Sequence, residues 1–269
     1  MINRRHWTLD DIPWSTLRRE RVAGCEELLY MVASASFIET TSDLYTHNLV
    51  RHFAGDAEVS AWLEQGWEPE ELQHGRALRK YLRHAWPEFD WEACYAGFYA
   101  DYGRLCKPEM LLPERSLELA ARCVVEMGTA SYYTAMHHAC DEPVLAQLAQ
   151  YIFQDEVGHY KYFHKYFRRY RDIEQPSRTQ VLGALWRRLL AINSEDGYIA
   201  LKHVHAALHP GKPYNKAVQK EVVGRIRKLA GKHVPHRLSV NMLLKPLELA
   251  PIARRLVQPA MIGVARLVA

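Results

Sequence analysis

Two short segments of this sequence carry the residues whose types and spacing best fit metal chemistry. Each is a Glu-x-x-His motif, Glu71–His74 and Glu156–His159. Residues three apart on a helix lie on one face, about one turn from each other, so each pair can bind one metal ion. Glu39 stands 32 residues before the first motif, and Glu126 stands 30 residues before the second. The predicted metal ligands are Glu39, Glu71, His74, Glu126, Glu156 and His159.

The charge of this ligand set indicates which ions it would hold. Four buried carboxylates need two divalent cations, because an unpaired buried carboxylate is costly or takes up a proton. One glutamate from each of two helices and a Glu-x-x-His from each of two others is the pattern of dinuclear carboxylate bundles. Carboxylate and imidazole ligands suit iron or manganese, and the set contains no cysteine. We therefore expect two iron ions, with manganese as an alternative.

The spacing of apolar residues predicts the helices that must position these side chains. Strand signals are scarce, and long stretches show helical periodicity with few glycine or proline residues. We expect long helices over about 21–53, 57–84, 113–139 and 143–171, and a short one over about 91–102. The second should kink near Trp67, because Gly66 and Pro69 interrupt it. The predicted fold class is an all-α four-helix bundle.

Beyond Gln175 the sequence predicts additional C-terminal helices without a recognisable motif. Helical patterns cover about 179–208 and 215–229, and prolines divide the remainder into short pieces. We therefore assign residues 1–175 to the bundle and residues 176–269 to a C-terminal helical extension packed on it.

Several segments around the motifs resemble one known family. Residues 67–75, Trp-Glu-Pro-Glu-Glu-Leu-Gln-His-Gly, resemble the second-helix motif of the soluble acyl-[acyl-carrier-protein] desaturases. Residues 155–159 resemble their D-E-x-x-H motif, and residues 126–129 resemble their E-x-x-T motif. The resemblance covers about residues 37–171, and no motif matches after Gln175. It indicates the ferritin-like di-iron carboxylate superfamily, with the desaturases as the most similar branch.

The resemblance implies an oxygen-activating di-iron oxidoreductase, a desaturase or hydroxylase acting on an apolar acyl substrate, free or carrier-bound. Its electrons would come from a ferredoxin-type donor. Thr129 would handle protons, and it shares a helix face with Glu126. Asp155 would hold a ligand histidine through a hydrogen bond. The alternatives for these two residues are a threonine bonded to its own helix backbone and a surface acid.

Two other functions fit the same ligands. A hydroxylase or N-oxygenase of another small metabolite or of a modified tRNA would have a shorter or more polar cavity. A ferroxidase or iron-handling protein would have an acidic ion path. A desaturase of long chains should instead have a narrow apolar tunnel beside the metal ions. Three other residues could act in a functional site, but we interpret Tyr133 as a core residue and His205 and His209 as structural histidines.

Composition and charge indicate the compartment of the protein and the partners that are not expected. The net charge of +4 is too small to imply DNA binding by itself. The five cysteines form no C-x-x-C pair, and the first ten residues are polar, which favours a reducing cytoplasm with free thiols. No apolar run reaches 18 residues, so a spanning helix is not expected.

Basic residues and the apolar C-terminal tail suggest partners. The basic residues that follow His74 and His159 could form a rim for an acidic acyl carrier protein; they are Arg76, Arg79, Lys80, Arg83, Lys161, Lys165, Arg168, Arg169 and Arg171. The tail over residues 256–269 could lie on a membrane surface. We favour its packing on the bundle or on a second subunit, and we expect a homodimer.

Overall fold

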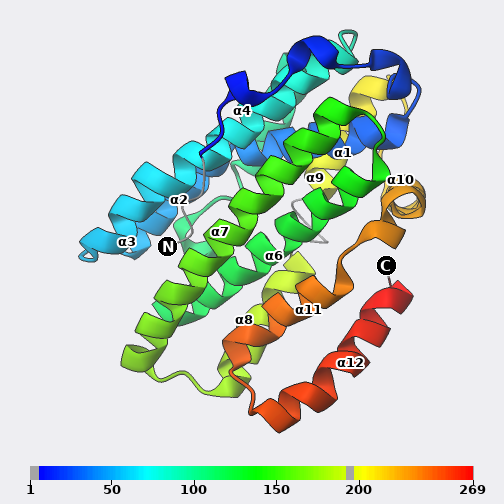
Figure 1. Ribbon diagram of the computed structural model, residues 1–269. Coiled ribbons are helices and arrows are strands. Elements are labelled where there is room, and N and C mark those ends of the chain that lie inside the picture. The colour runs from blue at the N-terminus through cyan, green and yellow to red at the C-terminus, as the bar shows by residue number, and fades with distance from the viewer. Residues whose placement is uncertain (1–5, 192–196, 269) are drawn as a thin grey trace.

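The computed structural model describes residues 6–191 and 197–268, and it contains no strand among them. The all-α prediction is therefore confirmed. Four helices form the bundle around the predicted ligands: α1 (Glu26–Thr40), α4 (Glu68–Ala85), α6 (Arg115–Ala139) and α7 (Pro143–Glu174). α6 and α7 pack along their length after a short turn, and α1 packs on α4 (Figure 1). Each pair of helices thus carries one lone glutamate and one Glu-x-x-His motif.

The first predicted helix, over 21–53, is in fact two helices, α1 and α2 (Ser42–His52). Thr40 and Thr41 explain the break between them. The Thr40 hydroxyl donates to the carbonyl of Ser36, and the Thr41 hydroxyl donates to the carbonyl of Ile38 at 2.8 Å. Such bonds from a threonine to its own helix backbone compete with the helical hydrogen bonds and bend the helix.

The predicted kink near Trp67 is confirmed. Between α3 (Ala57–Trp62) and α4 lies a π-helical segment, η4 (Leu63–Trp67), which contains Gly66. Pro69 follows this segment directly, in the first turn of α4, where it cannot donate a helical N–H. The irregular turn therefore ends just before the first Glu-x-x-His motif begins.

The remaining helices surround the bundle. They are α5 (Trp91–Tyr102), α8 (Arg178–Ala191), α9 (Gly197–Leu208), α10 (Lys216–Ala230), α11 (His236–Leu244) and α12 (Pro251–Val268), with short 3-10 turns at Leu9–Asp11, Trp14–Thr16, Arg19–Arg21, Pro108–Met110, Gly231–His233 and Lys245–Leu247. The middle of the predicted helix over 179–208 lies outside the described residues. The expectation of only short pieces near the C-terminus was wrong, because α12 continues through Pro259.

Two hydrophobic clusters form the core, and the C-terminal helices contribute to both. The first joins α1, α4 and α7 to Ala200, Val204 and Val222, and the second joins α6 and α7 to Leu185 and Met242. The extension is therefore packed on the bundle, while the domain boundary at residue 175 stays a prediction. Among the described residues, no helix is long and apolar enough to cross a membrane. All five cysteines are free.

Candidate metal centre

The six predicted ligands meet at the centre of the bundle in two overlapping groups. In each group, one ligand atom per residue lies within 4.8 Å of the others. The first group is Glu39, Glu71, His74 and Glu156, and the second is Glu71, Glu126, Glu156 and His159. All six side chains are buried. Glu71 and Glu156 belong to both groups, whereas each histidine and each lone glutamate belongs to one.

Every one of these side chains keeps one buried polar atom that has no hydrogen-bond partner. These atoms are Glu39 Oε2, Glu71 Oε1, His74 Nδ1, Glu126 Oε2, Glu156 Oε1 and His159 Nδ1. A buried polar atom without a partner costs about 1–3 kcal/mol, so six in one place would be hard to tolerate in a purely structural core. Two divalent ions would give each atom a partner, and the carboxylate and imidazole donors fit iron and manganese.

The distances between these atoms support the same two positions. His74 Nδ1 lies 3.5 Å from Glu39 Oε2 and 3.3 Å from Glu156 Oε1. His159 Nδ1 lies 2.9 Å from Glu71 Oε1 and 3.5 Å from Glu126 Oε2. Imidazole nitrogens and carboxylate oxygens that converge at such distances without hydrogen-bond geometry are what a site for cations requires.

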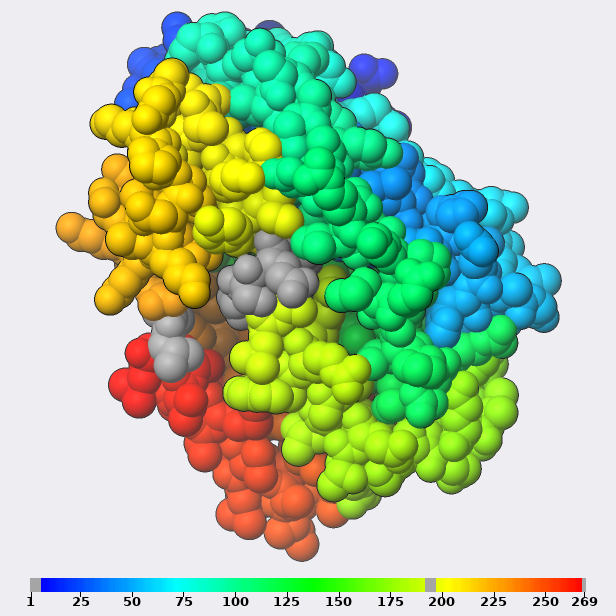
Figure 2. Space-filling model, turned by 180° about the vertical axis from the view of Figure 1, so that it is seen from behind, coloured from blue at the N-terminus to red at the C-terminus, as the bar shows by residue number. Residues whose placement is uncertain are grey.

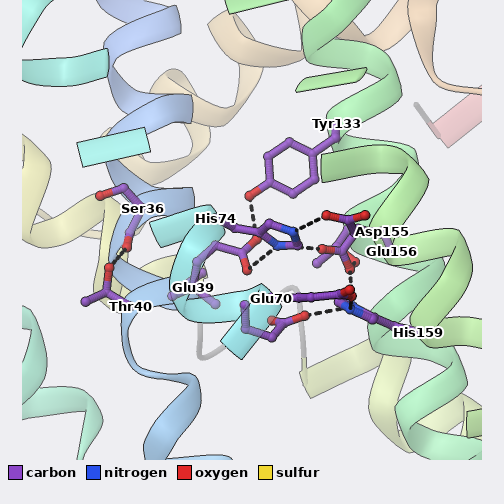
Figure 3. A network of polar contacts seen from close by, with 12 residues as sticks. Ser36, Glu39, Thr40, Glu70, His74, Tyr133, Asp155, Glu156 and His159 are labelled. Carbon is purple, nitrogen blue, oxygen red and sulfur yellow. Dashed lines mark hydrogen bonds and ion pairs between the residues drawn. The ribbon is translucent and has the colours of Figure 1, made fainter. Parts of the chain in front are cut away.

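The outer nitrogen of each histidine is held by a carboxylate from the opposite helix pair (Figure 3). His74 Nε2 lies 2.9 Å from Asp155 Oδ2, and His159 Nε2 lies 2.8 Å from Glu70 Oε2. A proton on each Nε2 would be donated to the carboxylate, which leaves the Nδ1 lone pair directed at the metal position. The structure thus places Asp155 in the position predicted for it, whereas sequence reasoning missed Glu70.

The N-terminal segment completes the shell around these carboxylates. Trp7 Nε1 donates to Asp155 Oδ2 at 2.6 Å, and the Trp7 ring is parallel to the His74 ring. His6 Nδ1 lies 3.1 Å from the second oxygen of Glu70. No local pattern could have linked Trp7 to a motif 148 residues away. Glu70 did carry a signal, because it precedes its ligand glutamate as Asp155 precedes Glu156.

Thr129 and Tyr133 contact the ligand carboxylates from α6. The Thr129 hydroxyl lies 2.6 Å from Glu156 Oε2 and 3.1 Å from the carbonyl of Glu126, so both alternatives for this residue find a partner. Tyr133 is fully packed in the core, as expected, but its hydroxyl also donates to Glu39 Oε1. Thr129 and Tyr133 therefore each bring an exchangeable proton to a different ligand carboxylate, Glu156 and Glu39.

The protonation of the metal-free ligand set is unusual. Burial, joined by the charge of Glu156, raises the pKa of Glu71. Burial also raises the pKa of Glu126 to about 8, although His159 opposes this. Burial works against the charge on Glu156 as well, but its contacts with His159 and His74 hold the pKa of this carboxyl below its usual range. The ligands therefore share protons that metal ions would displace, and metal binding should release protons.

The other histidines noted in the sequence lie away from this centre. His205 Nδ1 is 2.8 Å from the Tyr30 hydroxyl, and His209 Nε2 is 3.3 Å from Glu26 Oε1. Neither belongs to a group with metal-ligand spacing in the described part of the chain. These contacts agree with a structural role.

Two surface cavities lie outside the centre. One, of about 460 Å³, is lined by Asp43, Thr46, His47, Val50, Arg51, Glu64 and Glu68. The other, of about 600 Å³, lies between α5 and α9. Neither is lined by a predicted metal ligand, so the apolar tunnel expected beside the metal ions stays a prediction.

Comparison with known proteins gives a likeness among solved structures. A scan against protein-family models and a search of curated proteins found no match. Among solved structures, the chain is similar to a mutant of an R2-like ligand-binding oxidase with an aerobically reconstituted Mn/Fe cofactor. The TM-score is 0.51 at 13% identity, and the match covers 97% of this chain and 87% of that one. The fold is ferritin-like. At this identity the likeness establishes the arrangement of helices alone.

Within this ferritin-like bundle, Glu70 offers a direct test of the outer shell. We expect Glu70→Gln to weaken metal binding about 10–100-fold, because a neutral amide accepts the Nε2 proton more weakly than a carboxylate does and so lowers the basicity of His159. Competition with a chelator would measure the change. Glu221→Gln, an exposed position on α10, is the matched control. Equal metal affinity in Glu70→Gln and the unmodified protein would contradict a supporting role for Glu70.

Proposed function

We propose that this protein is an oxygen-activating oxidoreductase that uses two bound metal ions, either two irons or one manganese and one iron. The observation that carries the proposal is the convergence of six buried ligands, each with one unpartnered atom, into two overlapping groups. The shared fold with an oxidase that holds a Mn/Fe cofactor supports it. In this proposal, Glu71 and Glu156 would bridge the ions, Glu39 and His74 would complete one site, and Glu126 and His159 the other.

The protein side of the chemistry follows from the contacts around the ligands. Two bound ions would supply the means to activate dioxygen and remove hydrogen from an unactivated C–H bond. Thr129 would deliver or accept a proton beside Glu156, and Tyr133 would hold the second oxygen of Glu39. The buried surroundings would exclude bulk water, which strengthens each of these polar interactions.

For the substrate, we propose an apolar molecule, with desaturation or hydroxylation as the reaction. The aromatic and aliphatic side chains that pack around the ligands support this choice, because they would disfavour a charged molecule beside the metal ions. A hydroxylase or N-oxygenase of another metabolite or of a modified tRNA would use the same ligands.

The proposed protein partners have less support than the metal site. Much of the basic rim is already paired within the chain: Arg79 and Arg83 bind Glu92, and Arg169 binds Glu58. Paired side chains offer an acidic acyl carrier protein little free positive charge. The carrier protein, the ferredoxin-type donor and the homodimer therefore stay predictions.

Metal analysis tests the proposed function most directly. We expect the protein, expressed with ample iron and manganese, to contain about two of these ions per chain. Its reduced form should change its absorption spectrum on mixing with oxygen. A content below about one ion per chain after loading would contradict the proposal, and so would a loaded, reduced protein that does not react with oxygen.

Thr129 provides a second test, with a control on the same helix. We expect Thr129→Val to keep its metal ions but to react with oxygen about 100-fold more slowly, because a positioned proton donor is lost. Thr134→Val is the control, since among the described residues the Thr134 hydroxyl bonds only to the carbonyl of Ala130. Stopped-flow absorption of the reduced proteins would compare the rates. A rate unchanged by Thr129→Val would show that the Thr129 hydroxyl takes no part in the reaction with oxygen.

Iron handling is a second candidate function, and one observation favours it. The 460 Å³ cavity is acidic, and two of its residues lie close in sequence to predicted metal ligands: Asp43 four residues after Glu39, and Glu68 three residues before Glu71. Burial, with the charges of Asp43 and Glu64, raises the pKa of Glu68. Such a depression could attract ferrous ions. Slower iron loading in Glu68→Gln, with no organic substrate oxidised, would favour this function.

A further inference from the structure

The most exposed side chains of α12 are apolar. Ile252, Leu256 and Leu267 are 78%, 72% and 88% exposed. With Ala260 and Gly263 they follow the 3.6-residue repeat along one stripe of the helix. The opposite side of α12 packs on α11. A helix that packs through one side normally exposes polar residues on the other. The exposed side of α12 is apolar instead.

A neighbouring helix has the same feature. On α8, Leu182, Trp186 and Leu190 are spaced four residues apart, and each is more than half exposed. The inner side of α8, with Val181 and Leu185, packs into the core against α6. Figure 2 shows α8 in yellow-green and α12 in red, both exposed in the same view of the molecule.

The charged side chains on the helices of this region are of one sign. α8, α11 and α12 contain no aspartate or glutamate, and each carries at least one arginine. On α12, Arg255 and Arg266 are exposed and eleven residues apart, which places both along one edge of the apolar stripe. On α8, Arg187 is exposed next to Trp186. In the described part of the chain, none of these three arginines forms an ion pair with a carboxylate.

We propose that the exposed stripes of α8 and α12 form a docking surface for an anionic membrane. Apolar side chains bordered by arginine are the chemistry of a helix that lies in the membrane interface: the stripe enters the acyl boundary and the guanidinium groups bind lipid phosphates. A second copy of this chain fits less well. A two-fold interface would bring these arginines together without an acidic residue of the three helices to pair them. The inference does not rest on the proposed function.

The test uses the full-length, metal-loaded protein with two kinds of lipid vesicle. We expect it to sediment with vesicles of equal parts phosphatidylglycerol and phosphatidylcholine, and much less with phosphatidylcholine alone. Raising the salt concentration should weaken binding, because surface charges are then screened. Wild-type protein that does not bind the anionic vesicles would overturn the proposal.

Two paired variants test the two halves of the surface. Arg255→Gln with Arg266→Gln should weaken binding about 25-fold, about fivefold for each arginine removed. Leu256→Gln with Leu267→Gln should weaken it at least about tenfold, because apolar side chains no longer enter the bilayer. The controls are Arg18→Gln and Met110→Gln, at exposed positions just before the 3-10 turn Arg19–Arg21 and on the 3-10 turn Pro108–Met110.

Two other outcomes would contradict the membrane proposal. If the controls weaken binding as much as the α12 variants do, adsorption is unspecific and the proposal fails. If vesicles are not bound but the leucine variants convert a dimer into a monomer by light scattering, the surface is an interface between two copies. Metal content, measured on every variant, keeps this result separate from that for the metal centre.

Discussion

Replacing Glu156 with glutamine is expected to reduce metal binding by more than about 100-fold at both positions. Glu156 belongs to both ligand groups, and it also contacts Thr129. Loss of a supporting carboxylate around a metal site typically costs 10–100-fold, and loss of a bridging ligand should exceed that. Glutamine keeps the size of the side chain but removes the negative charge that the two ions need. Metal analysis after loading would measure the effect.

A measurement of helix content and a control variant distinguish loss of metal from loss of fold. Circular dichroism should show unchanged helix content, and the control Glu109→Gln, at an exposed position, should bind metal normally. Glu126→Gln makes a useful comparison, because Glu126 belongs to one group only and one ion should then survive. If Glu156→Gln retained both ions, the dinuclear arrangement would be wrong.

The convergence of the six residues could be predicted from the sequence because its signal is local and repeated. The three-residue spacing fixes Glu71 with His74, and Glu156 with His159, on one face of a helix whatever the rest of the fold does. The repeat then identifies the lone glutamates by their distance along the chain. The positions of several helices also follow from the periodicity of apolar residues. For this reason α5, α6 and α10 match the expected ranges within about two residues.

What the sequence could not predict depends on contacts between distant segments. Trp7 reaches Asp155 only because the N-terminal segment folds across α7, and no pattern near Trp7 announces this. The division of the first helix at Thr41 depends on threonine hydroxyls that donate hydrogen bonds to carbonyls of the same helix. The basic residues after His74 and His159 looked free in the sequence, and ion pairs such as Arg169 with Glu58 appear only in the fold.

Gly75 shows how the fold depends on one close approach beside the metal centre. It follows His74 on α4, and it faces Thr40, which follows Glu39 on α1. A Cβ atom at position 75 would lie 2.8 Å from the Thr40 backbone nitrogen and 3.0 Å from its Cα, and closer still to its hydroxyl. Real Cβ atoms essentially never approach so closely, and backbone atoms cannot move aside as a flexible side chain can. Only glycine lets α1 and α4 meet at this level.

We therefore expect Gly75→Ala to lower the free energy of unfolding by about 1–3 kcal/mol, as overpacking of a well-packed core does. It should also weaken metal binding, because separating α1 from α4 moves Glu39 away from His74. Gly224→Ala is the matched control: a Cβ there meets nothing within 4 Å, and alanine should stabilise α10 by about 0.5–1 kcal/mol. Urea unfolding of the metal-free proteins and chelator competition would measure both effects. A Gly75→Ala protein as stable and as tightly metal-binding as the original would mean that the two helices do not pack this closely.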